Sequence, residues 1–325
     1  MKPAPFEYED PGTVDEALDL LARYGDECKV LAGGQSLVPL MNFRLARPAR
    51  LIDSNGIASL SYIKREGEQM MIGAMTRHAE LEHSDEVRES WPLLNEAIGW
   101  VGHGQIRNRG TVGGSAAHAD PAAELPDAFA ALDASFLVSS TRGSRTIRWD
   151  QFFRSEFTTA LAPDELLTAV MVPAQDEAAG TAFVEYARRH GDFALGGAAV
   201  TLKLGSDGRC EKATIALLSA GPAPVRASAA EDQLRGAQVD EPSIRAAAAE
   251  ARRHSAKVKA YGRLAPMQFD VNLLNRSGWI AYDSLRQRDP ACIGGVDRWF
   301  QTAAREANGD TPSSPALVSP PAVFT

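Results

Sequence analysis

Two glycine pairs, about 80 residues apart, are the feature that most constrains what this chain can fold into. The first lies in VLAGGQSLV, from Val30 to Val38, and the second in GTVGGSA, from Gly110 to Ala116. Adjacent glycines remove two Cβ atoms and permit positive φ, so the backbone N–H groups around them can converge on an anion. A tight turn with close packing needs the same residues, and either interpretation fits one pair taken alone.

The first pair lies in a small βα unit that we predict over residues 1–55. Thr13 and Glu16 have the spacing of a capping box, and the helix that they start is expected to end at Gly25. A second helix is predicted over Ser36–Met41, because Pro39 is tolerated in a first helical turn. Short strands are predicted at Cys28–Leu31 and Arg50–Asp53.

The second pair lies in a longer unit, predicted over residues 56–175. Three apolar runs have the length of strands: Gln69–Gly73, Ser135–Val138 and Leu166–Val172. Helices are predicted from a cap at Thr76, over Trp91–Ile98 and over Pro121–Leu132. Both glycine pairs are therefore expected at breaks between a strand and a helix.

A third unit is predicted over residues 176–285, after a polar linker that follows Pro173. Its predicted strands are 181–188, 196–203 and Glu211–Ser219, and the last two are joined by a turn at Ser206–Gly208. Two alanine-rich helices follow, near 225–235 and 242–254. Residues 286–325 form an atypical tail rich in proline and serine, which is typical of disorder.

Charge and composition exclude several classes of function. The net charge of −8 gives no reason to expect a nucleic-acid partner, and no apolar run is long enough for a membrane span. The acidic N-terminus lacks the apolar stretch that a secretory signal needs. Cys28, Cys210 and Cys292 are too far apart for a metal site or an iron–sulfur cluster held by this chain. These features predict a cytoplasmic protein with no metal of its own.

Familiar nucleotide-binding motifs are absent from the sequence. Gly102 and Gly104 begin a GxGxxG pattern, but Arg107 stands where the third glycine belongs. The phosphate-binding pattern GxxxxGK[ST] does not occur either, which disfavours an NTPase. The two glycine pairs, each flanked by Ser or Thr, are left as the candidate site, and together they could hold a pyrophosphate from both sides.

Three segments resemble one known family. LAGGQSLVPLMNFRLARP (Leu31–Pro48), IRNRGTVGGSAAHADPAAELP (Ile106–Pro126) and YARRHGDFALGGAAV (Tyr186–Val200) are similar, in order and spacing, to the FAD-binding medium subunit of molybdenum hydroxylases. This is the xanthine dehydrogenase and carbon monoxide dehydrogenase family, and the resemblance covers roughly residues 1–270. It implies an α+β fold, with a two-part FAD-binding domain of the vanillyl-alcohol-oxidase (PCMH) type and a smaller α+β C-terminal flavoprotein domain.

The resemblance also implies a set of FAD-binding residues. One side of the pyrophosphate is assigned to the first glycine segment and the other to the second, with Asp120 near the ribityl chain, a backbone group of Leu166 or Leu167 at the flavin edge, and Asp192 near the ring. The assigned residues are Ala32, Gly33, Gly34, Gln35, Ser36, Thr111, Gly113, Gly114, Asp120, Leu166, Leu167 and Asp192. No catalytic residue and no metal ligand is expected.

Asp120 and Asp192 have structural alternatives, and several residues near the assigned set have more than one interpretation. Asp120 precedes a proline and is placed to cap the helix predicted over residues 121–132. Asp192 fits a turn, and His118 fits a structural histidine, a catalytic base or a covalent flavin attachment point. Arg107 and Arg109 fit either an attraction for the diphosphate or a solvated or interface position. Tyr186 and Phe193 are weaker candidates for ring contacts.

The function implied by the resemblance is electron transfer within a heteromeric enzyme. A large subunit carries the molybdenum cofactor and hydroxylates the substrate, a small iron–sulfur subunit carries the 2Fe-2S clusters, and noncovalent FAD on this chain passes electrons to an external acceptor. The sequence resembles the medium subunits of enzymes that oxidise purine-like or other N-heterocyclic substrates, caffeine-dehydrogenase-like enzymes among them. Carbon monoxide and aldehydes stay open as substrates.

Three rivals are weighed against this interpretation. A stand-alone flavin oxidase of the same fold would need a substrate pocket with a base, and often a covalent flavin link. A binding or assembly module would use the glycines as turns alone. A nucleotide-sugar reductase would need a Ser/Glu acid pair that we do not find. Beyond Asp270 the chain departs from the family, where a regular last helix is expected.

Overall fold

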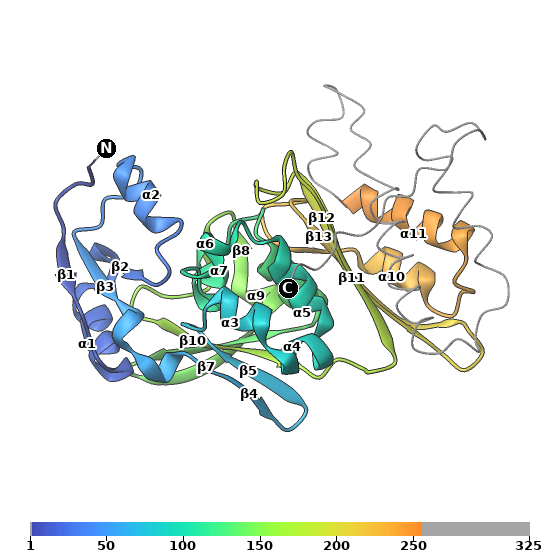
Figure 1. The fold of residues 1–325 in the computed structure, drawn as a ribbon, viewed down its shortest axis with the longest axis horizontal. Helices are drawn as coiled ribbons and strands as arrows, with labels where there is room; N and C mark the ends of the chain where they lie inside the picture. The colour runs from blue at the N-terminus through green and yellow to red at the C-terminus, as the bar shows by residue number, and fades with distance from the viewer. Residues whose placement is uncertain (1, 255–325) are drawn as a thin grey trace, which may run out of the picture. The chain divides into compact units, whose positions relative to one another are not determined.

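The computed structural model describes residues 2–254 (Figure 1). The expectations for the chain beyond that range, including the missing last helix and the disordered tail at 286–325, lie outside the described residues. No helix within the described range has the length and apolar character needed to cross a membrane.

The N-terminal part holds a three-stranded parallel sheet of order β1-β3-β2. Its strands are β1 (Glu7–Glu9), β2 (Cys28–Leu31) and β3 (Arg50–Asp53). Helix α1 (Val14–Tyr24) begins at the predicted capping box, where Thr13 Oγ1 accepts from the Glu16 N–H at 3.2 Å and the Glu16 carboxylate accepts from the Thr13 N–H at 3.2 Å. It ends at Gly25, whose φ is +49°. Helix α2 (Leu37–Asn42) follows the first glycine pair with Pro39 in its first turn.

A five-stranded antiparallel sheet of order β4-β5-β10-β6-β7 forms the middle of the described chain. Its strands are β4 (Ile63–Glu66), β5 (Gln69–Gly73), β6 (Ser135–Ser140), β7 (Gly143–Arg148) and β10 (Leu166–Pro173), and a separate hairpin pairs β8 (Phe153–Ser155) with β9 (Thr158–Thr159). The side chain of Phe136 stacks on Phe152 at 4.0 Å between ring centroids and meets Phe129 edge-on. These fully buried rings anchor the largest apolar core.

Seven helices described here accompany this sheet: α3 (His78–His83), α4 (Asp85–Ser90), α5 (Pro92–Trp100), α6 (Gly104–Arg107), α7 (Val112–His118), α8 (Glu124–Ala131) and α9 (Trp149–Phe152). The predicted cap at Thr76 is wrong, because its hydroxyl donates to the Tyr62 carbonyl at 2.8 Å and α3 starts one residue later, after Arg77.

The interpretation of the second glycine segment as a loop after a strand is also wrong. A short helix, α6, precedes it, and Gly113 and Gly114 lie in the first turn of α7. The helix is stabilised by tertiary bonds that the sequence does not reveal, since the Gly113 N–H donates to the Ala74 carbonyl at 2.8 Å.

A four-stranded antiparallel sheet of order β11-β12-β13-β14 forms the last described part. It comprises β11 (Ala179–Tyr186), β12 (Gly196–Leu204), β13 (Cys210–Leu218) and β14 (Val225–Arg226), with helices α10 (Ser228–Leu234) and α11 (Glu241–His254) side by side in Figure 1. The helix predicted near 225–235 is therefore shorter, because its first residues pair with β13. Glu96 of α5 joins this sheet to the middle part by accepting from Thr181 Oγ1 at 2.8 Å and the Phe183 N–H at 2.7 Å.

Candidate functional site

The first glycine segment, residues 32–36, connects the end of β2 to the start of α2. Gly34 has a φ of +73°, and Gln35 Nε2 donates to the Gly33 carbonyl at 3.1 Å, which folds the segment back on itself. Within residues 2–254, no protein acceptor meets the N–H groups of Gly33, Gly34, Gln35 or Ser36. Gly33 is itself buried, and an unmet buried N–H is costly. The segment therefore offers a cradle of backbone donors for an acceptor that is not part of the chain.

The second glycine segment has the N–H groups of Val112, Gly113 and Gly114 already in use. Thr111 caps α7, and its Oγ1 accepts from the Gly114 N–H at 3.1 Å. The N–H of Val112 donates to the Thr76 carbonyl at 3.0 Å, and that of Gly113 to Ala74. A Cβ at Gly113 would lie 2.5 Å from the Ala74 Cβ. This segment thus contributes close packing and shape, whereas the first contributes the available N–H groups.

The two glycine segments lie against each other. A Cβ added at Gly33 would lie 2.5 Å from the Arg109 carbonyl oxygen and 2.8 Å from the Gly110 Cα, distances that real Cβ atoms do not adopt. A Cβ at Gly114 would meet the Ala32 Cβ at 3.4 Å. The expectation that both pairs belong to one place in the molecule therefore agrees with the geometry, and glycine at position 33 is required by that contact.

The buried His78 packs against the second glycine segment and contacts its backbone. The His78 N–H donates to the Gly110 carbonyl at 3.0 Å, and His78 Nε2 lies 2.9 Å from the Thr111 carbonyl oxygen. Burial lowers the pKa of His78 to about 4, outweighing the contact with Thr111, so the ring is neutral at neutral pH. The sequence interpretation missed this residue, although it directly follows the predicted cap at Thr76.

The arginines next to the second segment have different roles. Arg107 donates to both carboxylate oxygens of Glu82, at 2.7 and 2.9 Å, and to the Val101 carbonyl at 3.1 Å. Its guanidinium is a structural ion pair and is therefore not available to a diphosphate. Arg109 is exposed, and its carbonyl is the atom that touches Gly33.

Asp120 does not cap the predicted helix. Its Oδ1 accepts from the Ala122 N–H at 2.9 Å, which makes a local turn, and α8 begins only at Glu124. The nearby His118 ring lies 5.1 Å from the exposed Phe157 ring. Burial lowers the pKa of His118, against the opposing charge of Asp120.

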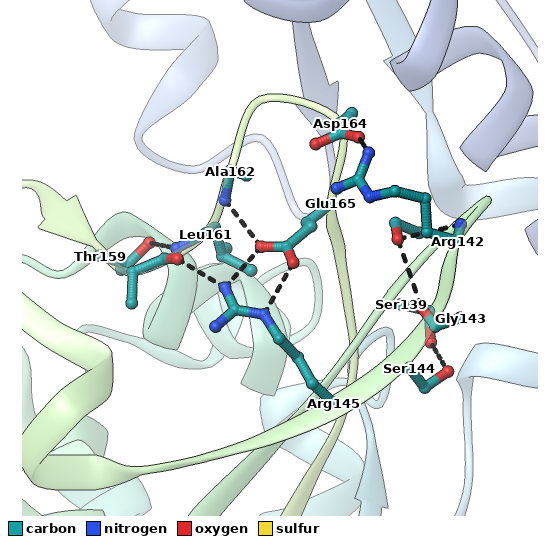
Figure 2. Close-up of polar contacts among 12 residues, drawn as sticks. Ser139, Arg142, Gly143, Ser144, Arg145, Thr159, Leu161, Ala162, Asp164 and Glu165 are labelled. Atoms are coloured by element: carbon teal, nitrogen blue, oxygen red, sulfur yellow. Dashed lines mark hydrogen bonds and ion pairs between the residues drawn. The ribbon is translucent and has the colours of Figure 1, made fainter.

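Leu166 and Leu167 are buried at the start of β10. Leu166 belongs to the apolar cluster on which Ala32 packs, so it lies near the first glycine segment, whereas Leu167 belongs to the core of the middle sheet. The chain leading to Leu166 is held by Arg145, which donates to both oxygens of Glu165 at 2.7 and 2.8 Å (Figure 2). The side chains of Leu166 and Leu167 belong to the apolar core, which leaves only the backbone groups of these two residues for a ligand.

Asp192 lies in the exposed connection between β11 and β12, where its N–H donates to the Arg189 carbonyl at 3.1 Å. In the same connection Gly191 packs against the His103 ring, and His190 stacks on Trp100 at 5.4 Å. The contacts thus bring this connection to the turn between α5 and α6, and no contact places Asp192 at the glycine segments. The assignment of Asp192 to a cofactor stays a prediction, as does that of every other residue in the predicted FAD-binding set.

Comparison with known proteins shows which family this chain belongs to. Residues 4–175 match the family model for the FAD binding domain in molybdopterin dehydrogenase, and residues 181–262 match the CO dehydrogenase flavoprotein C-terminal domain. The chain is 45% identical over 248 residues to the 6-hydroxypseudooxynicotine dehydrogenase complex subunit alpha of Paenarthrobacter nicotinovorans, a match that covers 76% of this chain and 84% of that protein.

A further relative and a solved structure point to the same family. Caffeine dehydrogenase subunit beta of a Pseudomonas species is 42% identical over 240 residues, covering 74% of this chain and 81% of that protein. A solved carbon monoxide dehydrogenase from Hydrogenophaga pseudoflava superposes with a TM-score of 0.77 at 36% sequence identity, covering 89% of this chain and 99% of that one.

The fold and the family matches thus define an FAD-binding flavoprotein. Within that class, the chain belongs to the medium-subunit family of the molybdenum hydroxylases, which includes the carbon monoxide dehydrogenases. The expected α+β fold, with an FAD-binding domain followed by a C-terminal flavoprotein domain, is confirmed. FAD fits the residues present, because Gly33 touches Arg109 and Gly110 and the four N–H groups from Gly33 to Ser36 have no acceptor within residues 2–254.

Proposed function

We propose that this chain is the FAD-carrying electron-transfer subunit of a heteromeric molybdenum hydroxylase. In this proposal a partner with 2Fe-2S clusters delivers electrons, a large subunit holds the molybdenum cofactor and the substrate, and an external acceptor takes the electrons away. The observation that carries the proposal is the set of N–H groups at Gly33–Ser36, where Gly33 packs against Arg109 and Gly110, in a chain of this family.

The residues of this chain act by binding and orientation. The Gly33–Ser36 donors hold the negative charge of the diphosphate, and Gly33 and Gly114 leave the room that a close approach needs. The bound flavin supplies the one- and two-electron redox chemistry. We assign the remaining contacts to Ala32, Thr111, Gly113, Asp120, to backbone groups of Leu166 or Leu167, and to Asp192. No side chain of this chain is assigned as an acid, base or nucleophile.

The substrate class is proposed as a small purine or other N-heterocycle. Two relatives are named caffeine dehydrogenase subunit beta and nicotine 6-hydroxylase medium subunit, and the second is 38% identical over 251 residues. A stand-alone flavin oxidase is not favoured, since the relatives are named as subunits or medium chains. We further propose domain limits at residues 55, 175 and 285, and a cytoplasmic location.

Absorption spectroscopy of the purified chain tests the proposal, with spectra taken before and after acid precipitation. Flavin bands that move to the supernatant are expected for noncovalent FAD, whereas bands that stay with the pellet would indicate a covalent oxidase. Expression with the two partner genes should then give a complex whose flavin is reduced by an N-heterocyclic substrate. Reduction of the flavin by the same substrate in the isolated chain would contradict the electron-transfer role.

A further inference from the structure

Two side chains connect the glycine segments through hydrogen bonds. Asn55, which follows β3, donates from Nδ2 to the Ala32 carbonyl at 3.0 Å. Arg77, which precedes α3, donates from Nη2 to Asn55 Oδ1 at 2.6 Å and from Nη1 to the Arg109 carbonyl. An unbroken series of bonds therefore runs from the backbone of the first segment to the backbone of the second.

The Arg109 carbonyl is held from two directions. It lies against the Cα of Gly33 on one side and accepts from Arg77 on the other. Contact alone sets only how near the two segments come. The bond from Arg77 also fixes the direction of the carbonyl, and with it the peptide plane between Arg109 and Gly110.

The orientation of Asn55 is fixed by a charged neighbour. Asp53 Oδ1 accepts from the Asn55 N–H at 2.9 Å and from Asn55 Nδ2 at 2.5 Å, and its other oxygen accepts from Tyr8. Burial raises the pKa of Asp53, but the bonds from Tyr8 and Asn55 lower it overall, so this carboxylate is charged at neutral pH. The amide nitrogen of Asn55 is thereby directed to Asp53 and Ala32, which leaves the amide oxygen for Arg77.

The geometry points to Arg77 and Asn55 as positioning residues that fix the orientation of the Arg109 carbonyl against the first glycine segment and hence the affinity for the diphosphate of FAD. Neither residue is assigned a contact with the cofactor. This inference rests on the proposed function, because it needs the cradle at Gly33–Ser36 to be the diphosphate site. Lysine cannot replace Arg77 fully, since a single ammonium group has no planar fork to bridge an amide and a carbonyl.

Titration of FAD into the full chain after removal of its flavin tests the inference. Arg77→Gln and Asn55→Ala are each expected to raise the Kd for FAD about 10- to 100-fold. The double variant is expected to bind about as weakly as Arg77→Gln alone, because both residues act through one series of bonds. Arg77→Lys should recover part of the affinity.

Arg209→Gln is the matched control. Arg209 also donates to a backbone carbonyl, that of Gly236 at 2.8 Å, but it lies in the connection between β12 and β13 and touches neither glycine segment. Its Kd for FAD is expected to be unchanged.

The second readout is FMN, which has one phosphate in place of the diphosphate and its adenosine. A positioning role lowers the preference for FAD over FMN in the Arg77 and Asn55 variants, whereas general damage weakens both alike. Wild-type affinity for FAD, or an equal loss for both flavins, would overturn the inference. Should Arg77→Gln fail to fold, Asn55→Ala decides by the same two measurements. Failure of the wild-type chain to bind FAD would instead refute the proposed function.

Discussion

Replacing Gly33 by alanine isolates the contact between the two glycine segments. The new Cβ would meet the Arg109 carbonyl oxygen at 2.5 Å, the Gly110 Cα at 2.8 Å and the Arg109 carbonyl carbon at 3.0 Å. All three are backbone atoms, so no side chain can rotate away, and the oxygen must withdraw to at least 3.0 Å. Gly33 does not have a positive φ, and alanine keeps the N–H group, so the substitution changes the spacing of the segments and little else.

The expected cost follows from overpacking. An extra methyl group in a well-packed place costs about 1–3 kcal/mol. If the widened gap is felt mainly in the bound state, the Kd for FAD rises roughly 5- to 150-fold, at 1.4 kcal/mol for each factor of ten. Quenching of FAD fluorescence on titration into the flavin-free chain measures this change, at a temperature well below the unfolding midpoint of the variant.

Gly99→Ala is the control for this experiment. Gly99 lies in α5 with no atom near the position of its Cβ, and alanine is the better helix former there. The control should leave the Kd for FAD unchanged and raise the free energy of unfolding by about 0.5–1 kcal/mol. Binding of FAD by Gly33→Ala as tight as in the wild type would refute the reasoning, since the contact between the segments would then not determine the cradle.

Three further substitutions test other parts of the described structure. Gly114→Val should abolish flavin retention and leave the C-terminal domain folded, because a Cβ there would lie 2.6 Å from Thr111 Oγ1; flavin occupancy at the wild-type level would contradict this role. The buried His78, with its pKa of about 4, takes up its proton later than the unfolded chain as pH falls, so it costs the fold about 2 kcal/mol between pH 7 and pH 5. His78→Gln should remove this difference between the free energies of unfolding at pH 7 and pH 5, which urea unfolding at the two pH values measures. A difference as large as in the wild type would contradict the prediction. Arg145→Gln leaves the nearly buried Glu165 carboxylate without its cation and should lower the free energy of unfolding at pH 7 by about 1–3 kcal/mol in a thermal melt, with an unaltered melt as the opposing result.

Local signals in the sequence predicted the elements that local interactions determine. The capping box at Thr13 and Glu16 and the glycine at position 25 gave α1 its correct ends, and β5 was predicted with its observed bounds. In these places the apolar periodicity and the turn residues agree with the tertiary structure.

The sequence predictions failed where tertiary hydrogen bonds determine the local structure. Two adjacent glycines disfavour a helix, yet α7 forms around them because Ala74 and Thr76 accept bonds from its first turn. Asn55 and Arg77 carry no motif, and their role arises only because the fold brings them to the two glycine segments. The assignment of residues 32–36 came from the resemblance, whereas their unmet N–H groups are visible only in three dimensions.

The unequal partnering of donors in the two glycine segments bears on how the site is completed. The amides of Val112, Gly113 and Gly114 are bonded to the protein itself, so folding alone finishes that wall. Within residues 2–254 the amides from Gly33 to Ser36 have no protein acceptor, which leaves them for water or a ligand. Deuterium uptake should therefore slow at residues 33–36 when FAD enters and hardly change at residues 112–114. The flavin-free chain therefore keeps the hydrogen bonds of the second glycine segment, and only the first segment gains partners when the cofactor binds.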